Sequence, residues 1–242
     1  ASIDLGTQNL ATLAFNKDFA PLIIPGGPLI SINQWYNKNL AQMKSALPQG
    51  IYTSKAIQKF SYIRKNKIKD YMHKTSKKIV DVLLKTKTST LVIGYNPLWK
   101  QNVNIGKVNN QKFVMIPYLQ FIQMLQYKCE LQGITVILNE ESYTSKCSFL
   151  DEESIEKHDE YQGKRVHRGL FKTASGTLIN ADVNGALNIM KKGVPEAFAE
   201  GIAGVVVHPL KMKIPQGPSK HVSIQKDSRE GCRPRSSVEK NL

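Results

Sequence analysis

The segment from residue 90 to residue 138 constrains the fold more than any other part of the chain. Residues 90–93 (TLVI) and 134–138 (ITVIL) are apolar, largely β-branched runs of the kind that form buried strands. Between them, helical spacing of apolar residues predicts an amphipathic helix over about 116–131, which Gly133 ends. A strand, a helix and a strand at this spacing predict two parallel strands joined by a right-handed crossover. We therefore expect an α/β protein.

The elements on either side extend this unit. Residues 1–15 predict a strand, a turn and a second strand, and residues 29–33 begin a third strand after the turn at 26–28. Residues 52–87 have helical spacing, and residues 181–190 form a last helix. This order is that of RNase H-like folds, in which helices flank a mixed sheet and the first strand is central.

Two aspartates stand at matching places in this expected fold. Asp4 lies in the first strand, and Asp182 begins the last helix, which packs near the end of that strand. Clustered carboxylates repel unless cations are present, and Mg²⁺ prefers oxygen ligands. Each aspartate alone has an ordinary explanation, a turn before Gly6 or a helix dipole. Together, in a basic chain, they favour a metal-dependent nuclease, which needs a third acid, normally a glutamate.

The charge of the chain points to an anionic partner. Lys and Arg number 34 against 19 Asp and Glu, for a formal net charge of +15. Over residues 52–87, eleven Lys or Arg side chains face only Asp70 and Asp81. A solvated helix usually carries acids that balance such a surplus, so we expect this helix to face nucleic-acid phosphates. The expected contacts there are Lys65, Lys69, Lys74 and Lys77.

The cellular setting follows from three further features. The three cysteines form no Cys-x-x-Cys pair, which favours a reducing compartment. No apolar run approaches the roughly 20 residues of a spanning helix, so no membrane partner is expected. The chain starts inside an expected strand, so we expect an upstream part of the same protein to be missing. These features predict a cytoplasmic, nucleoid-associated protein.

Four motifs, in order, carry a family resemblance. They are SIDLG at 2–6, KDYMHK at 69–74, YTSKCS at 143–148 and NADVNGA at 180–186. They resemble the TnpB family, OrfB-type proteins of insertion sequences related to compact RNA-guided CRISPR nucleases and Fanzor proteins, over about residues 1–192. The resemblance implies a RuvC-type DNA endonuclease that uses Mg²⁺ or Mn²⁺ and a guide RNA from the element's end. It also implies that Asp4 and Asp182 are the first and third catalytic acids.

The second acidic position departs from the family pattern. Where typical members end an apolar strand with Glu, this chain has Gly94. One explanation is an inactive site. The other is that Glu141 replaces the missing acid from the end of the next strand, with Glu140 as the substitute candidate. That glutamate would have to reach across roughly 10 Å of sheet, two strand spacings, and a glycine between leaves the path open. Certain TnpB and Fanzor proteins resemble this arrangement, so Glu141 is preferred.

The zinc ribbon of the family is also altered. Cys147 matches the first of four thiolate ligands, but Leu150, Lys172 and Ser175 stand at the others, so no zinc site is expected. The region 146–178 is expected to be a small irregular insertion in place of the ribbon, held by apolar packing of Phe149, Leu150, Leu170 and Phe171. His158 and His167 are expected at the surface rather than as replacement ligands.

Several other residues are candidates for contact with nucleic acid. Trp99, Lys100 and Gln101 follow the Gly94 strand, although Trp99 is equally explained as a core aromatic. In the insertion, Lys164, Arg165 and Arg168 form a basic cluster that the resemblance assigns to loading the DNA strand. Lys146, beside Thr144 and Ser145, is a candidate for a phosphate near Glu141, with a simple loop cap as the alternative.

The expected organisation has four parts. Residues 1–145 form the first part of the nuclease core, with a basic helical insertion at 52–88. Residues 146–178 form the insertion, residues 179–208 complete the core with its final helix, and residues 209–242 form a disordered tail. The leading hypothesis is an RNA-guided DNA endonuclease core. The alternatives are a catalytically inactive, TnpB-derived DNA-binding protein and a guide-free RuvC-like junction nuclease.

Overall fold

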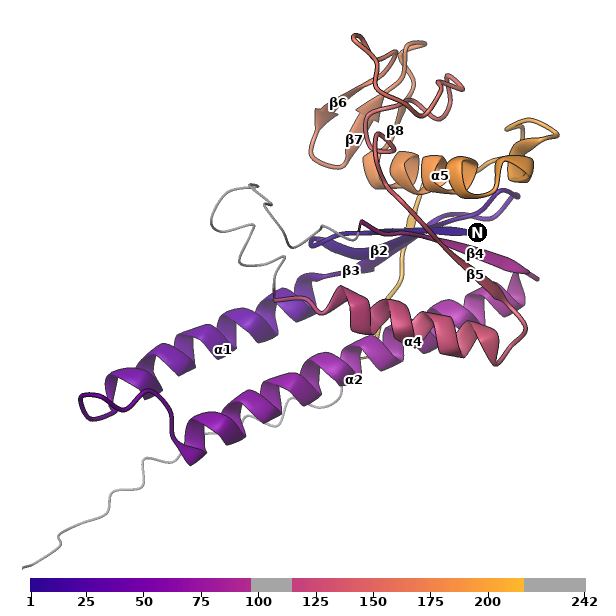
Figure 1. The fold of residues 1–242 in the computed structure, drawn as a ribbon. Coiled ribbons are helices and arrows are strands. Elements are labelled where there is room, and N and C mark those ends of the chain that lie inside the picture. Colours follow the sequence, from indigo (N-terminus) through magenta and orange to yellow (C-terminus); the bar gives the residue numbers. More distant parts are fainter. Residues whose placement is uncertain (97–114, 216–242) are drawn as a thin grey trace, which may run out of the picture.

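A computed structural model of the chain describes residues 1–96 and 115–215. Its centre is a six-stranded mixed sheet in the order β5-β4-β1-β2-β3-β9 (Figure 1). The strands of this sheet are β1 (Ser2–Leu5), β2 (Asn9–Ala14), β3 (Leu22–Pro25), β4 (Thr90–Gly94), β5 (Thr135–Asn139) and β9 (Leu210–Lys211). The first strand is central, as the RNase H-like order predicts.

Helices lie on both faces of the sheet (Figure 1). The helix α5 packs on one face, against β1, β2, β4 and β5, while α1, α2 and α4 form a layer on the other. The short helix η1 follows α5. The helices are α1 (Gly27–Ser45), α2 (Lys55–Lys85), α4 (Tyr118–Glu130), α5 (Ala181–Gly193) and η1 (Pro195–Phe198).

The strand pairing fixes where the functional residues meet. β1 pairs antiparallel with β2 and parallel with β4, and β4 pairs parallel with β5. β4, α4 and β5 thus form the predicted parallel crossover. The main core lies between this sheet and the helical layer, where Ile3, Ile93, Leu83 and Phe121 are fully buried.

Local sequence accounts for the ends of the helices that carry the site. Ser54 caps α2 by accepting a hydrogen bond from the Ile57 amide at 3.2 Å. Asn180 caps α5, because its side-chain oxygen accepts from the amides of Asp182 and Val183 at 3.0 and 3.1 Å. The Asn180 cap therefore fixes Asp182 in the first turn of α5.

Two predictions about strands are wrong. Residues 29–33 lie in α1, because Pro28 presets the backbone at the start of that helix, and the third strand is the preceding segment Leu22–Pro25. The segment 134–138 forms β5 as expected, but β5 is an edge strand with exposed or half-buried residues. Its apolar composition resembled that of the buried β4, and only the sheet order distinguishes them.

Two further expectations, one about the insertion and one about the tail, are corrected. The insertion at 146–178 is not irregular throughout, because β6 (Lys164–His167), β7 (Leu170–Lys172) and β8 (Leu178–Asn180) form an antiparallel sheet. The tail predicted at 209–242 is ordered at its start. There, β9 pairs in parallel with β3, and Met212 and Ile214 are buried against the core. The rest of that prediction, from residue 216, lies outside the described residues.

Candidate nuclease site

Asp4 lies on β1 at the centre of the sheet. Ile3 pairs with Ile93 of β4, so Asp4 and Gly94 follow as the next residues on these neighbouring strands. The pKa of the Asp4 carboxyl lies well above its usual range because burial disfavours the charged form and because Glu141 and Asp182 repel that charge. Arg165 acts in the opposite direction. The charges of Asp4, Glu141 and Asp182, which come from distant parts of the chain, therefore act on one another at this place.

The helix α5 brings Asp182 to this place. At Gly185, one turn after Asp182, the helix passes so close to β1 that an added Cβ would lie 3.0 Å from Asp4 Oδ2. Asp182 itself is held by two neighbouring side chains. Its Oδ2 accepts a hydrogen bond from Asn9 Nδ2 at 2.7 Å, and its Oδ1 lies 3.6 Å from Arg165 Nη2. The structure therefore brings together the two aspartates that the sequence paired.

Glu141 reaches this site across β4. A Cβ built on Gly94 would collide with Glu141 Oε1, would lie 2.8 Å from Glu141 Cγ, and would lie 2.5 Å from Ile189 Cδ1 of α5. The Glu141 side chain therefore occupies the space above Gly94. Any larger residue at position 94 would displace it, so the glycine and the glutamate fit each other sterically.

The neighbouring glutamate points elsewhere. Glu140 is exposed, and its Oε2 lies 3.6 Å from Lys192 Nζ. Thr144 is buried, and both its amide and its hydroxyl donate to the carbonyl of Glu141, at 3.2 and 2.8 Å. The turn thus carries a loop cap that fixes the backbone of Glu141, and phosphate binding by Lys146 stays a prediction.

Two residues of the site were missed in the sequence. Asn9 orients Asp182, and Tyr118 lies buried at the start of α4, where its hydroxyl donates to the Gly6 carbonyl at 2.9 Å. The pKa of Tyr118 is raised by burial and by the charges of Asp4 and Glu141. Tyr118 occupies an apolar position of a helix in the sequence, so only a tertiary contact could have identified it.

Two of the three carboxylates, those of Asp4 and Asp182, border a cleft that carries basic residues. Asp4, Asp182, Arg165 and Arg168 line it together with the loop at 5–9. Because arginine binds phosphate through several donors, such a cleft suits a phosphodiester backbone held against the acids. Two other residues that were predicted to bind nucleic acid do not line this cleft. Lys164 is exposed on β6, and Lys146 Nζ lies 5.6 Å from the centre of the Tyr161 ring.

The acids suit a hard divalent cation. Carboxylate oxygens are the ligands that Mg²⁺ prefers, and a cation would relieve the repulsion that raises the pKa of Asp4. Among residues 1–96 and 115–215, however, no three acidic, His or Cys side chains already stand close enough to bind one ion. Binding of one ion by all three acids would therefore require at least one of their side chains to change position.

The lysines predicted on α2 divide into two pairs. Lys65 and Lys69 are exposed. Lys74 instead forms an ion pair with Asp70 at 2.6 Å, and Lys77 forms one with Asp81 at 3.0 Å. The two acids of this helix therefore neutralise two of the four predicted contacts. Trp99, Lys100 and Gln101 lie outside the described residues.

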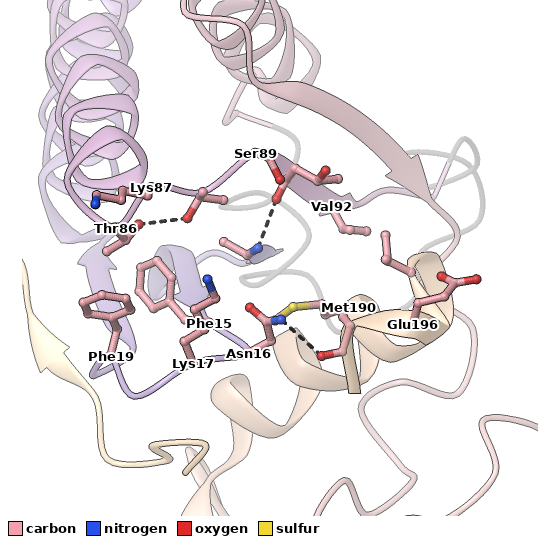
Figure 2. A pocket seen from close by; sticks show the side chains of 15 residues that line it. Phe15, Asn16, Lys17, Phe19, Thr86, Lys87, Ser89, Val92, Met190 and Glu196 are labelled. Atoms are coloured by element: carbon pink, nitrogen blue, oxygen red, sulfur yellow. Dashed lines mark hydrogen bonds between the residues drawn. The ribbon is translucent and has the colours of Figure 1, made fainter. Parts of the chain in front are cut away.

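A second cavity lies at the other end of β1 (Figure 2). Phe15, Phe19 and Met190 supply apolar surface there, and Lys17 and Lys87 stand at its border. Glu196 is the one acidic residue in the lining. With a single carboxylate, this cavity offers no site for the two-carboxylate or three-carboxylate chemistry expected of a nuclease.

Comparison with known families agrees with the fold. The OrfB/IS605 family, described as a probable transposase, matches residues 1–99. The TNB domain of Cas12f1-like proteins matches residues 118–189. The two matches together take in most of the chain and include all three acids.

Individual relatives point the same way. The CRISPR-associated endodeoxyribonuclease Cas12f1 of Sulfoacidibacillus thermotolerans is 27% identical over 83% of this chain and 47% of its own length. Cas12f2 of a Micrarchaeota archaeon (strain CG1_02_47_40) is 29% identical over 50% of this chain and 23% of its own. The chain therefore spans about half the length of the first of these relatives and about a quarter of the length of the second.

Solved structures share the fold. A Cas12f1–sgRNA–target DNA complex aligns with a TM-score of 0.56 and 18% identity, over 80% of this chain and 49% of that one. A CRISPR–Cas12f ternary complex aligns with the same TM-score and identity, over 77% of this chain and 37% of that one.

In the described part of the chain, no helix is both long enough and apolar enough to cross a bilayer.

The hydroxyl of Tyr118 generates a first prediction. Tyr118→Phe keeps the ring but leaves the partly buried Gly6 carbonyl without this donor, so we expect a loss of about 1–3 kcal/mol in the free energy of unfolding. The control is Tyr127→Phe on the same helix, where the side chain is exposed. Chemical denaturation of both variants measures the difference, and equal stabilities would contradict the assigned hydrogen bond.

Proposed function

We propose that this TnpB-type chain, whose residues 1–99 match the OrfB/IS605 family, is the catalytic core of an RNA-guided DNA endonuclease. The observation that supports this proposal is the place of Glu141, whose side chain lies over Gly94 on the strand next to that of Asp4. With Asp4 and Asp182, this side chain would complete the three carboxylates that the chemistry requires.

Each residue of the site has a role in this proposal. Asp4, Glu141 and Asp182 would hold Mg²⁺ or Mn²⁺, and the chemistry that such ions supply is activation of a water and neutralisation of the leaving oxygen. Arg165 and Arg168 would bind the DNA phosphate in the cleft. Before DNA arrives, Arg165 compensates the charge of Asp182, and we propose that it exchanges this carboxylate for the phosphate.

A second surface would hold nucleic acid away from the cleft. On the exposed side of α2, Lys55, Lys59, Lys65 and Lys69 surround Tyr62, which is 64% exposed. These residues recur at spacings of three or four and so share one face of the helix. A row of cations around an aromatic ring suits a phosphate backbone. We propose that it contacts the guide RNA or the DNA target, since Cas12f1 forms a complex with both.

The inactive alternative rests on a different observation. Asp182 is engaged by Asn9 and Arg165, which is also the arrangement expected of a DNA-binding protein that has lost its metal ions. Cleavage by the protein at its full natural length, with its guide RNA and Mg²⁺, separates these two functions. A cut in unguided branched DNA would instead favour the junction nuclease.

The two glutamates give the direct test. We expect Glu141→Ala to lower the rate of guided cleavage at least about 100-fold, because the acid beside Asp4 is lost. Glu140→Ala should cleave at nearly the wild-type rate, since Glu140 is exposed and faces Lys192. Single-turnover cleavage measures both. If cutting survives Glu141→Ala, the assignment of Glu141 is wrong.

Gly94 gives a steric test of the same site. Gly94→Ala places a methyl group where the Glu141 side chain lies, so we expect cleavage to fall about tenfold or more while DNA binding is kept. Gly27→Ala is the control, because a Cβ at Gly27 meets no atom within 4 Å. Wild-type cleavage by Gly94→Ala would show that Glu141 does not need this path.

The α2 surface predicts a change in salt dependence. Each phosphate contact contributes about 0.9 to the slope of log affinity against log salt, so Lys65→Ala with Lys69→Ala should lower the slope by roughly 1 to 2. Lys74→Ala and Lys77→Ala should change it less, because both lysines are paired with aspartates. Fluorescence anisotropy with nonspecific duplex DNA measures the slopes. Equal slopes for the two sets would exclude the proposed face.

A further inference from the structure

The insertion between Cys147 and Thr177 is held together without a metal-binding residue set. The zinc that the family implies does not fit here, because Leu150, Lys172 and Ser175 stand where thiolates are needed. The remaining Cys147 is buried, and its Sγ donates to the Glu156 carbonyl at 3.7 Å. A single thiol does not make a four-ligand zinc site.

We propose that the carboxylates of Asp151 and Glu153 cross-link this insertion in the role that zinc has in the family, so that it folds without metal. This inference does not depend on nuclease activity. It rests on the hydrogen bonds that the two side chains accept, which connect segments far apart in the insertion.

Asp151 joins the two turns that the zinc ligands would otherwise join. Its Oδ2 accepts from the hydroxyl of Ser148 at 2.5 Å and from the amide of Ala174 at 2.8 Å. Ser148 directly follows Cys147, and Ala174 lies between Lys172 and Ser175. One carboxylate oxygen thus bridges the first ligand pair of the family pattern to the second.

Glu153 closes the long loop that leads to β6. Its side chain is buried, its Oε2 accepts from the Ser148 amide at 2.6 Å, and its Oε1 accepts from the Gln162 amide at 3.0 Å. Hydrogen bonds to an ionised carboxylate are stronger than neutral ones. His158 is partly exposed, with Nε2 at 3.9 Å from Glu153 Oε1, and His167 is exposed.

The cross-linked loop is fastened to α5 by a second set of contacts. Asn184 accepts from the Phe149 amide at 2.9 Å and donates to the Cys147 carbonyl at 2.9 Å, and Asn188 donates to the same carbonyl at 2.8 Å. Phe149 and Phe171 are buried, as the packing prediction required. The insertion is therefore anchored to the helix that carries Asp182 and leads through β6 to Arg165.

The alternative that the same acids bind another metal has no support in the described residues. Asp151 and Glu153 already accept hydrogen bonds from Ser148, Gln162 and Ala174, and no three acidic, His or Cys groups there are placed for one ion. Their oxygens point at protein donors, as in a structural bridge.

The first test is the metal content of the protein at its full natural length. After expression in zinc-supplemented medium, we expect far less than one zinc per chain by elemental analysis. A zinc-selective chelator that spares Mg²⁺ should leave the melting temperature unchanged. One zinc per chain that this chelator removes with a fall in melting temperature would overturn the inference.

The second test removes each bridge. Glu153→Gln should lower the hydrogen-exchange protection of the Ser148 and Gln162 amides about tenfold or more, and Asp151→Asn should do the same at Ala174. The matched controls are Glu160→Gln and Asp159→Asn, exposed acids of the same loop. Protection in the bridge variants equal to that in the controls would overturn the proposal. Exchange is read without cleavage, so this result stays separate from any failure of the nuclease function.

Discussion

Three carboxylates meet at one end of the central strand, and the repulsion between them is the constraint to which the neighbouring residues respond. Asp4 shows the effect of this repulsion, since burial and the two other acids raise its pKa well above the usual range. Arg165 and Asn9 stabilise Asp182 through an ion pair and a hydrogen bond. The site therefore has an internal cation and an amide donor where divalent ions would provide the stronger compensation.

The Glu141 side chain can cross β4 only because position 94 is a glycine. Gly94 has no side chain, and the glutamate from the edge of the sheet crosses this space toward Asp4. The helix α5 also passes close to Asp4 at Gly185. The glycine on β4 thus leaves the room that the longer Glu141 side chain occupies.

Much of the fold could be predicted because it follows local patterns. The β4–α4–β5 crossover, the central β1 and the last helix correspond to apolar periodicity and capping residues in the sequence. The errors arose where tertiary pairing decides. Residues 29–33 are apolar enough for a strand but continue from Pro28 as helix, and β9 forms only because β3 has an open edge. Neither the helix at residues 29–33 nor the pairing of β9 can be predicted from a short segment of the sequence.

The sequence by itself determined the acids, their order and the family, because residue identity and motif spacing are properties of the linear chain. It also favoured Glu141 over its neighbour Glu140, but only through the family resemblance. Only the tertiary structure shows where the two side chains point, since the Thr144 cap and the open space above Gly94 direct Glu141 inward while Glu140 meets Lys192 at the surface. The direction of a side chain depends on atoms that the sequence places far away.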